Sequence, residues 1–157
     1  MRSCIFGLVV LFAATTGVVT AAAERGTDQE AMAMVVEAVE LFDRVGPEAT
    51  FAAINAPETA FKDRDLFALV WRMDGMLMAN GNGARLVGTQ RWDFRDAGGT
   101  YLTRLIIETA TNGGGWVNYD WQDPKTGNMH AKSTYAIALS DEYVIGVGVY
   151  GYKVDED

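Results

Sequence analysis

The chain has 157 residues, of which 49% are hydrophobic, and its net charge at pH 7 is −8. This length suits one domain, and the acidic balance opposes binding to nucleic acid or to anionic lipid over most of the surface. One histidine and one cysteine exclude a multi-histidine metal site and a cysteine-rich zinc site. The sequence also contains no recognisable phosphate-binding loop or activated nucleophile, so we expect no catalytic residues, no metal and no cofactor.

The N-terminal segment has the pattern of a secretory signal peptide. Arg2 precedes an apolar run over residues 5–19, and the small residues 20–23 end in an Ala-x-Ala cleavage site. The alternative, a membrane anchor, is disfavoured because the apolar run falls short of the ~20 residues that span a bilayer. We expect cleavage after residue 23, which removes Cys4. A single soluble domain, 24–157, would then be secreted to the periplasm without inserting into the membrane.

Residues 27–46 are predicted to form a long helix. Thr27 and Glu30 match a capping box, and Gly46 ends the segment. Apolar residues at steps of three and four form one stripe that we expect to face the core: Met32, Val35, Val36, Val39 and Phe42. Pro47 suits the first turn of a second, short helix that runs to residue 55.

Strands and turns dominate the rest of the chain. Five segments have strand character: 66–73, 76–79, 116–122, 131–139 and 143–150. Asp74-Gly75 makes a hairpin of the first two, and the irregular segment 84–99 is either a binding loop or a cover over the sheet. Residues 101–110 form a short amphipathic helix. The predicted fold class is α+β, with a long N-terminal helix packed on an antiparallel sheet of about five strands.

The hairpin formed by 116–122 and 131–139 carries the strongest candidate site. Tyr119 and Trp121 share one face of the first strand, and Lys132 and Thr134 share a face of the second. If these faces coincide, an ammonium, a phenol and an indole converge, which suits a small carboxylate because a buried anion needs a cation and donors. Two alternatives remain open. Lys132 pairs with Asp120 or Asp123, or the aromatic rings only fill the core.

Three further residues are candidates for the same site. Trp71 lies on the first strand, where a ligand wall and core packing are equally consistent with its position. Tyr101 begins the helix beside the irregular segment, so its phenol either reaches a ligand or lies at the surface. Arg91, together with Arg95 and Arg104, adds positive charge near that segment, and an arginine fork suits a carboxylate, although exposed salt bridges are the alternative.

Several stretches, taken in order, resemble the single Cache domain family, the extracytoplasmic ligand-sensing modules of chemoreceptors and sensor kinases. The matching stretches are Gly46-Pro47-Glu48-Ala49, 61–67, Met73-Asp74-Gly75, 86–88, 96–99 followed by Tyr101, 113–121, Pro124-Lys125-Thr126-Gly127, 132–135 and 147–150. The resemblance implies a PAS-like antiparallel sheet, a long N-terminal helix against it, and a pocket for small molecules such as short carboxylates. In contrast to receptor members of the family, the sequence ends five residues after Tyr152, so we expect no output domain of its own.

Two functional hypotheses follow. In the first, the chain is an extracytoplasmic domain that binds or senses a small organic anion with Trp71, Arg91, Tyr101, Tyr119, Trp121 and Lys132, and reports to a membrane receptor or transporter. In the second, it binds no ligand and serves as a protein-interaction subunit of an envelope complex. The environment of Lys132 discriminates between them, since a lysine paired only within the chain leaves no place for an acid.

Overall fold

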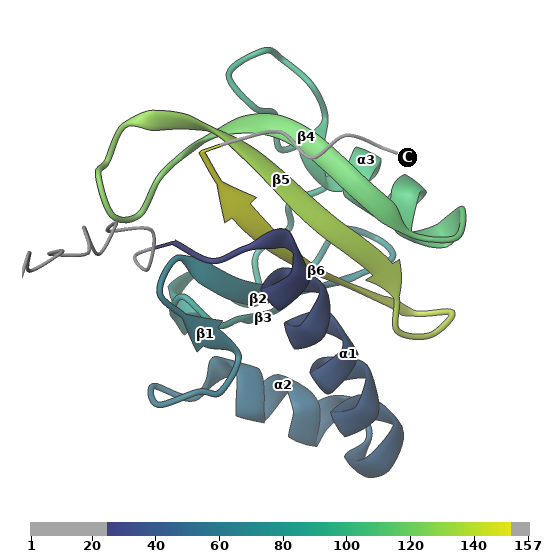
Figure 1. Cartoon of the computed structure of the whole chain (residues 1–157). Coiled ribbons are helices and arrows are strands. Elements are labelled where there is room, and N and C mark those ends of the chain that lie inside the picture. The colour runs from purple at the N-terminus through teal and green to yellow at the C-terminus, as the bar shows by residue number, and fades with distance from the viewer. Residues whose placement is uncertain (1–24, 152–157) are drawn as a thin grey trace, which may run out of the picture.

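A computed structural model describes residues 25–151, so the predicted signal peptide and its cleavage site lie outside the described residues (Figure 1). The helices are α1 (Asp28–Val45), α2 (Pro47–Asn55) and α3 (Leu102–Thr111). The strands are β1 (Lys62–Asp63), β2 (Leu66–Arg72), β3 (Leu77–Asn80), β4 (Gly115–Gln122), β5 (Met129–Ala138) and β6 (Tyr143–Tyr150). These elements confirm the predicted α+β class and lie close to the predicted ranges.

All six strands belong to one antiparallel sheet. Its order is β1-β2-β6-β5-β4, and β3 also pairs with β2, so the last strand in the sequence lies in the middle of the sheet. The sequence predicted about five strands and missed β1. This strand has only two residues, too few to show a period in the sequence.

The start and end of α1 follow the predicted signals. The Thr27 hydroxyl accepts a hydrogen bond from the Glu30 N–H at 3.3 Å, and the Glu30 carboxylate accepts one from the Thr27 N–H at 2.9 Å. Gly46 ends the helix with φ of 80°, a conformation that favours glycine.

The predicted apolar stripe of α1 is wrong in part. Met32 and Val36 are 39% and 53% exposed. The buried residues of the helix are Ala31, Met34, Val35 and Ala38, so Val35 alone of the predicted stripe is buried, while Val39 and Phe42 are half-buried. Ala31 and Ala38 on this face let the helix backbone lie close to the sheet. The face that is buried is therefore rotated about the helix axis from the face that was predicted from the larger apolar side chains. Counting large apolar residues alone overlooks such positions.

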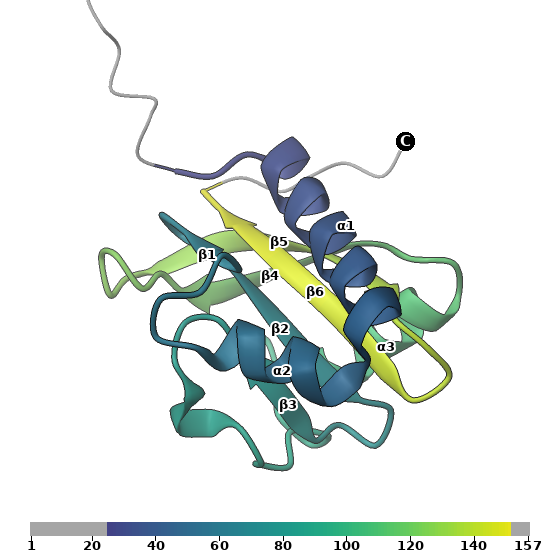
Figure 2. The ribbon, with the colours of Figure 1, turned by 90° about the horizontal axis from the view of Figure 1, so that it is seen from below.

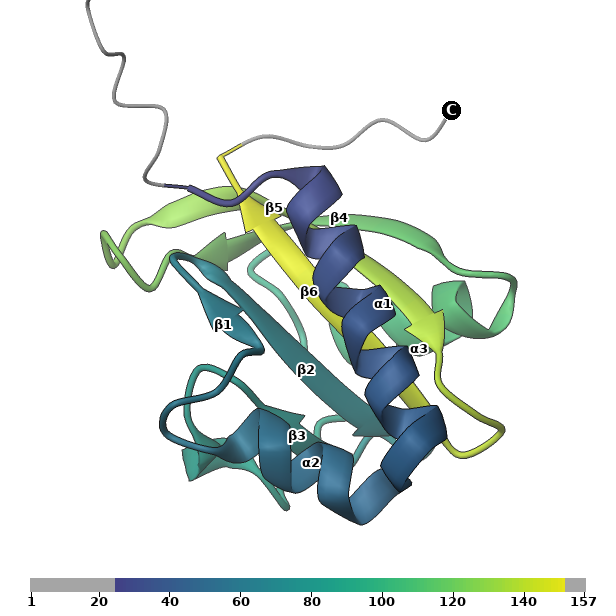
Figure 3. The same cartoon turned by 60° about the horizontal axis from the view of Figure 1, so that its bottom comes forward.

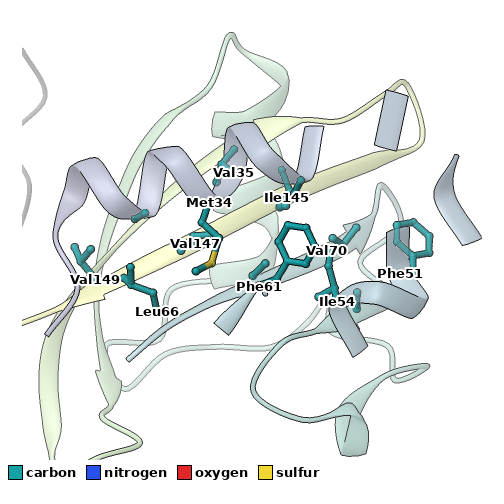
Figure 4. Close-up of a cluster of buried hydrophobic side chains, with 14 residues drawn as sticks. Met34, Val35, Phe51, Ile54, Phe61, Leu66, Val70, Ile145, Val147 and Val149 are labelled. Atoms are coloured by element: carbon teal, nitrogen blue, oxygen red, sulfur yellow. The ribbon is translucent and has the colours of Figure 1, made fainter. Parts of the chain in front are cut away.

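The sheet has a separate hydrophobic core on each face. Helices α1 and α2 cover one face, where Val35, Ile54, Val70, Ile145 and Val147 are among the fully buried side chains (Figure 4). Helix α3 covers the other face, where Leu102 and Ile106 pack with side chains of β2, β4 and β6. Figures 2 and 3 show α1 and α2 in front of the sheet and α3 behind it. Among the described residues, no helix is long and apolar enough to cross a membrane.

Candidate ligand-binding site

A cavity of about 170 Å³ lies on the sheet face that carries α3. The sheet contributes Phe67, Leu69, Trp71, Leu77, Asn80, Tyr119, Trp121 and Lys132, α3 contributes Leu102, Thr103 and Ile106, and the segment between β3 and α3 contributes Asn82, Leu86, Arg91 and Phe94. The walls are therefore mostly apolar, with a few polar and charged groups among them. Small-molecule sites commonly have this composition.

The register of the sheet brings the predicted residues together. Tyr119 on β4 lies opposite Lys132 on β5, and Val117 lies opposite Thr134. The two side-chain faces of the hairpin therefore coincide, as the first hypothesis requires. The Tyr119 hydroxyl and the Thr134 hydroxyl share a hydrogen bond of 2.8 Å in the interior.

Lys132 is the most unusual side chain of the cavity. A lysine with its ordinary pKa is charged at neutral pH, yet this one is only 2% exposed. Its Nζ donates a hydrogen bond to the Tyr150 hydroxyl at 3.0 Å. The same Nζ lies 4.5 Å from the centre of the Phe67 ring and 4.4 Å from that of Tyr150. Within the described part of the chain, no carboxylate forms a salt bridge with Lys132, and Asp123 pairs with Arg25 instead.

Burial changes the acid–base chemistry of this site. Desolvation lowers the pKa of Lys132 from 10.5 to about 7, although the charges of Asp65 and Asp123 act in the opposite direction. Burial raises the pKa of the Tyr119 and Tyr150 phenols, so both remain neutral donors at physiological pH. The cavity thus holds one group that changes its charge near neutral pH.

Two glycines of β6 make room for side chains of neighbouring strands, and Gly148 makes room for the lysine. A Cβ on Gly148 would lie 2.1 Å from Lys132 Cε and 2.7 Å from Thr134 Oγ1, and a Cβ on Gly146 would lie 2.8 Å from Thr134 Cγ2. Alternating glycines in a strand fit a close approach by bulky neighbours, which here are Lys132 and Thr134 of β5 and Trp71 of β2. The Lys132 side chain can therefore cross the surface of β6 toward Tyr150.

The segment between β3 and α3 forms one wall of the cavity. The Phe94 ring lies 5.3 Å from that of Trp121, and the Arg91 guanidinium lies 4.2 Å above the Phe94 ring. Phe94 therefore connects this segment to β4 at the edge of the cavity. The segment acts as a cover, one of the two roles that its irregular sequence indicated.

Five of the six predicted ligand residues line the cavity: Trp71, Arg91, Tyr119, Trp121 and Lys132. Tyr101 does not line it. Its ring is stacked between the guanidinium groups of Arg95 and Arg104, at 3.6 and 3.9 Å, and Arg95 donates a hydrogen bond to its hydroxyl. Tyr101 thus lies half-buried outside the cavity, as in the surface alternative that the sequence left open.

Several cavity residues were missed in the sequence. Phe67 lies four residues before Trp71 on β2, so strand parity was a usable signal for it. Tyr150 does not line the cavity but contacts Lys132, and it continues the alternation of Gly146 and Gly148. Asn80 and Asn82 follow the predicted strand segment 76–79, and Thr103 lies within the predicted helix 101–110. Nothing local to these three residues indicates that they face a cavity.

The acidic residues near β1 have different environments. The Asp63 side chain is exposed, whereas the Asp65 carboxylate is completely buried and paired with Arg25. Within the described residues, no group of three or more histidine, cysteine, aspartate or glutamate side chains is arranged to hold a metal ion. The cavity itself presents an ammonium, a guanidinium, hydroxyl and amide groups, and aromatic rings, which can contact a ligand through charge, hydrogen bonds and shape.

Comparison with known proteins identifies the family to which this sequence is similar. Residues 22–157 match the family described as Single Cache domain 2. The sensor histidine kinase MctS of Rhizobium johnstonii (strain DSM 114642 / LMG 32736 / 3841) is 31% identical over 114 residues, which are 70% of this chain and 25% of that protein. The chain thus spans about a quarter of the length of this relative.

Solved structures share the fold at lower identity. A methyl-accepting chemotaxis protein from Vibrio parahaemolyticus RIMD 2210633 has a TM-score of 0.68 at 19% identity, over 78% of this chain and 86% of that one. A periplasmic sensor domain of a chemotaxis protein has a TM-score of 0.59 at 20% identity, over 78% and 88%. A Cache chemosensory domain that recognises carboxylic acid has a TM-score of 0.59 at 16% identity, over 78% and 86%.

Proposed function

This chain belongs to the single Cache domain family, a family of sensor domains, and from that premise we propose that it senses a short organic carboxylate outside the cytoplasm. The cavity between the sheet, α3 and the segment after β3 would be the binding site. The ligand state would be passed to a membrane receptor or transporter. Periplasmic location after removal of residues 1–23 is part of the same proposal.

The environment of Lys132 is the observation that carries the proposal. A buried ammonium is costly unless a negative partner compensates it, and among the described residues the Lys132 ammonium makes its direct contacts with a neutral phenol and two aromatic rings, while Asp65 and Asp123 act on it only without a salt bridge. A ligand carboxylate would supply the missing charge. The pair would form in a water-poor cavity, where a charge-assisted hydrogen bond is stronger than in water.

The size and the lining of the cavity define the ligand class. A volume of about 170 Å³ is below the ~300 Å³ at which typical drug-sized sites begin, which favours an acid of two to four carbons. Lys132 would neutralise the carboxylate, and Trp71 and Trp121 would exclude water. Arg91, Asn80 and Thr103 would serve a second polar group. A Cache domain of the same fold recognises carboxylic acid, which supports this class.

The alternative of a ligand-free interaction subunit requires Lys132 to be satisfied within the chain. The predicted intrachain partners were Asp120 and Asp123. Asp123 pairs with Arg25, and neither carboxylate forms a salt bridge with Lys132. The cavity beside the lysine is also not filled by side chains. Both observations favour the ligand-binding function.

A binding experiment with Lys132→Met tests the proposal. The wild-type domain is expected to show saturable binding in a panel of acetate, propionate, pyruvate and lactate, with a rise in Tm because a ligand of the native state stabilises it. Lys132→Met should lose both responses. Its Tm without ligand should not fall, since replacing a buried charge with an apolar side chain of similar size is often neutral or stabilising.

The matched control is Lys62→Met, which removes an exposed lysine of β1 and should leave binding unchanged. Calorimetry and thermal unfolding give both readouts on the same samples. Undiminished binding by Lys132→Met, or no response of the wild type to any of the four acids, would contradict the proposed function.

A further inference from the structure

Arg25 joins three segments that are far apart in the sequence. It lies just before α1, and its Nη1 donates to Asp65, which precedes β2, at 3.1 Å. Its Nη2 donates to Asp123, which follows β4, at 2.5 Å. One guanidinium therefore binds two carboxylates. We call Arg25, Asp65 and Asp123 the arginine clasp.

Both carboxylates of the arginine clasp are fully buried, whereas the Arg25 side chain is 33% exposed. Each carboxylate accepts a further hydrogen bond from the backbone, Asp65 from the Gly26 N–H at 2.7 Å and Asp123 from the Lys125 N–H at 2.8 Å. Burial alone would raise the pKa of Asp123, but the hydrogen bonds from Arg25 and Lys125 hold it below its usual range. Asp123 is thus a charged, buried carboxylate.

The same two carboxylates act on Lys132. Arg25 lies beside the strand end that contacts the lysine, since a Cβ on Gly151 would lie 4.0 Å from Arg25 Cδ and the preceding residue, Tyr150, accepts the hydrogen bond of Lys132. The charges of the two carboxylates favour the ammonium form of Lys132, yet neither forms a salt bridge with it. Arg25 approaches them from the solvent side and Lys132 lies in the interior. Without Arg25, two uncompensated buried carboxylates would face one ammonium, which would become their counterion.

We propose that Arg25 is a positioning residue for the anion site, because it occupies Asp65 and Asp123 and so leaves the Lys132 ammonium to a ligand. This inference rests on the proposed function. Counting formal charges, Arg25, Asp65, Asp123 and protonated Lys132 sum to zero. Without Arg25 the sum is −1, so the four positions would repel an incoming carboxylate. With Arg25 present the sum is zero and this net repulsion is absent.

Arg25→Gln tests this role with acetate, propionate, pyruvate and lactate as probes. We expect the Kd of whichever acid binds the wild type to rise about tenfold or more, since two carboxylates lose their counterion at a buried site. Arg64→Gln is the matched control. Arg64 also anchors this segment, donating to the Arg25 carbonyl at 2.8 Å, but it pairs with Glu30 and Asp63 and not with the buried carboxylates. Its Kd should stay at the wild-type value.

Rescue separates electrostatic positioning from a merely structural role. The triple variant Arg25→Gln, Asp65→Asn, Asp123→Asn removes the repelling charges and should recover most of the lost affinity. The titration of Lys132, followed by NMR of its labelled side chain, should move to higher pH in Arg25→Gln and to lower pH in the double variant Asp65→Asn, Asp123→Asn. A structural anchor alone would produce neither the rescue nor the opposite shifts.

The outcomes also distinguish this inference from the proposed function. If the wild type binds none of the acids, the proposed function fails and the inference fails with it. If the wild type binds and Arg25→Gln binds equally, or if the triple variant is not rescued, only the role of Arg25 is overturned. Should Arg25→Gln not fold, the double variant decides, since an unchanged titration of Lys132 would mean that the carboxylates do not act on it.

Discussion

A buried lysine next to neutral partners costs folding free energy, because the ammonium loses its hydration and gains no opposite charge in exchange. In this domain the cost is reduced by a hydrogen bond to Tyr150 and by two ring faces, whose electron density attracts a cation. The remaining cost appears as the lowered pKa of Lys132. A carboxylate in the cavity would offset it, so the residue that weakens the unliganded fold is the one that would strengthen the complex.

Binding should depend on pH through this lysine. Its pKa of about 7 means that an acid bound above pH 7 must bring a proton to the site. The Kd for a short carboxylate is expected to be constant below pH 7 and to rise roughly tenfold per pH unit above it. Calorimetry at pH 8 in buffers of different ionisation enthalpy should show uptake of about one proton. Equal affinity at pH 6 and pH 8 would contradict this.

The stability of the unliganded domain should also depend on pH through Lys132. The unfolded lysine has an ordinary pKa, so between pH 7 and about 10 the unfolded state binds more protons and this group makes stability rise with pH. Lys132→Met should lack that contribution. The other ionisable groups around Lys132 are the carboxylates of Asp65 and Asp123, the guanidinium groups of Arg25 and Arg91, and the buried phenols of Tyr119 and Tyr150.

Gly148 offers a second test at the residue scale. In Gly148→Ala the new Cβ would overlap with Lys132 Cε and Thr134 Oγ1, so the lysine must leave its position. We expect carboxylate binding to be lost and the domain to be destabilised by about 1–3 kcal/mol, as is usual for overpacking. Gly98→Ala, where the nearest atom to the new Cβ is 3.4 Å away, is the control and should change neither quantity. Unchanged affinity in Gly148→Ala would argue against the position of the lysine.

At the scale of elements, the site is built by the antiparallel hairpin of β4 and β5, with β2 and β6 completing its floor. Strand pairing places Tyr119 opposite Lys132, and β6 lies between β2 and β5 with glycines where the lysine crosses it. The segment between β3 and α3 contributes the opposite wall. Rigid strands therefore hold the charged group, and a long connection covers it. Binding sites commonly combine a rigid scaffold with loops in this way.

The contact of Phe94 with Trp121 is expected to hold this cover in place. In Phe94→Ala the cover loses its aromatic contact with β4 and the stacking of Arg91 over Phe94. Because a looser cover lets the ligand escape, the dissociation rate of a short carboxylate should rise several-fold while association changes little. The neighbouring Trp92, which does not line the cavity, supplies the control Trp92→Ala. Stopped-flow competition would measure both rates, and equal dissociation rates in the two variants would refute the idea.

At the scale of the whole molecule, the two faces of the sheet have different roles. The face under α1 and α2 is a tightly packed apolar core, whereas the face under α3 leaves the cavity beside Lys132. Burial of the first face supports folding in a domain that is predicted to lack disulfides once residues 1–23 are removed. The arginine clasp connects the start of α1 to the edge of the second face.

Processing of the N-terminus is a prediction for the whole chain. Expressed with its first 23 residues, the protein should be exported and cleaved between Ala23 and Glu24, which leaves Arg25 as the second residue of the mature domain. Intact-mass measurement of the periplasmic fraction would establish the new N-terminus. Ala21→Glu and Ala23→Glu, which place a large charged side chain in the cleavage motif, should block processing. A periplasmic product that retains residues 1–23 would contradict the prediction.

The amino-acid sequence by itself determined the fold class, the limits of most elements and five residues that the fold brings to one cavity. These features depend on local physical chemistry: capping at Thr27 and Glu30, the turn at Asp74-Gly75, and the alternation that places Tyr119 and Trp121 on one face. Lys132 could be identified as a candidate ligand residue because a lysine on a strand beside an aromatic strand is unusual, whichever residues of the two strands lie opposite each other. The buried face of α1 was predicted wrongly in part because it does not depend on local sequence alone. It depends on how closely Ala31 and Ala38 let the helix approach the sheet.

Only the tertiary structure decided which partners each side chain has. Tyr101 stacks with Arg95 and Arg104 outside the cavity, while Phe67 and Tyr150 flank the lysine, and neither outcome follows from spacing along one strand. The pairing of Arg25 with Asp65 and Asp123 spans 40 and 98 residues. The sequence records which charges exist, but burial and distance decide whether Lys132 has an intrachain partner, because both depend on how the whole chain packs.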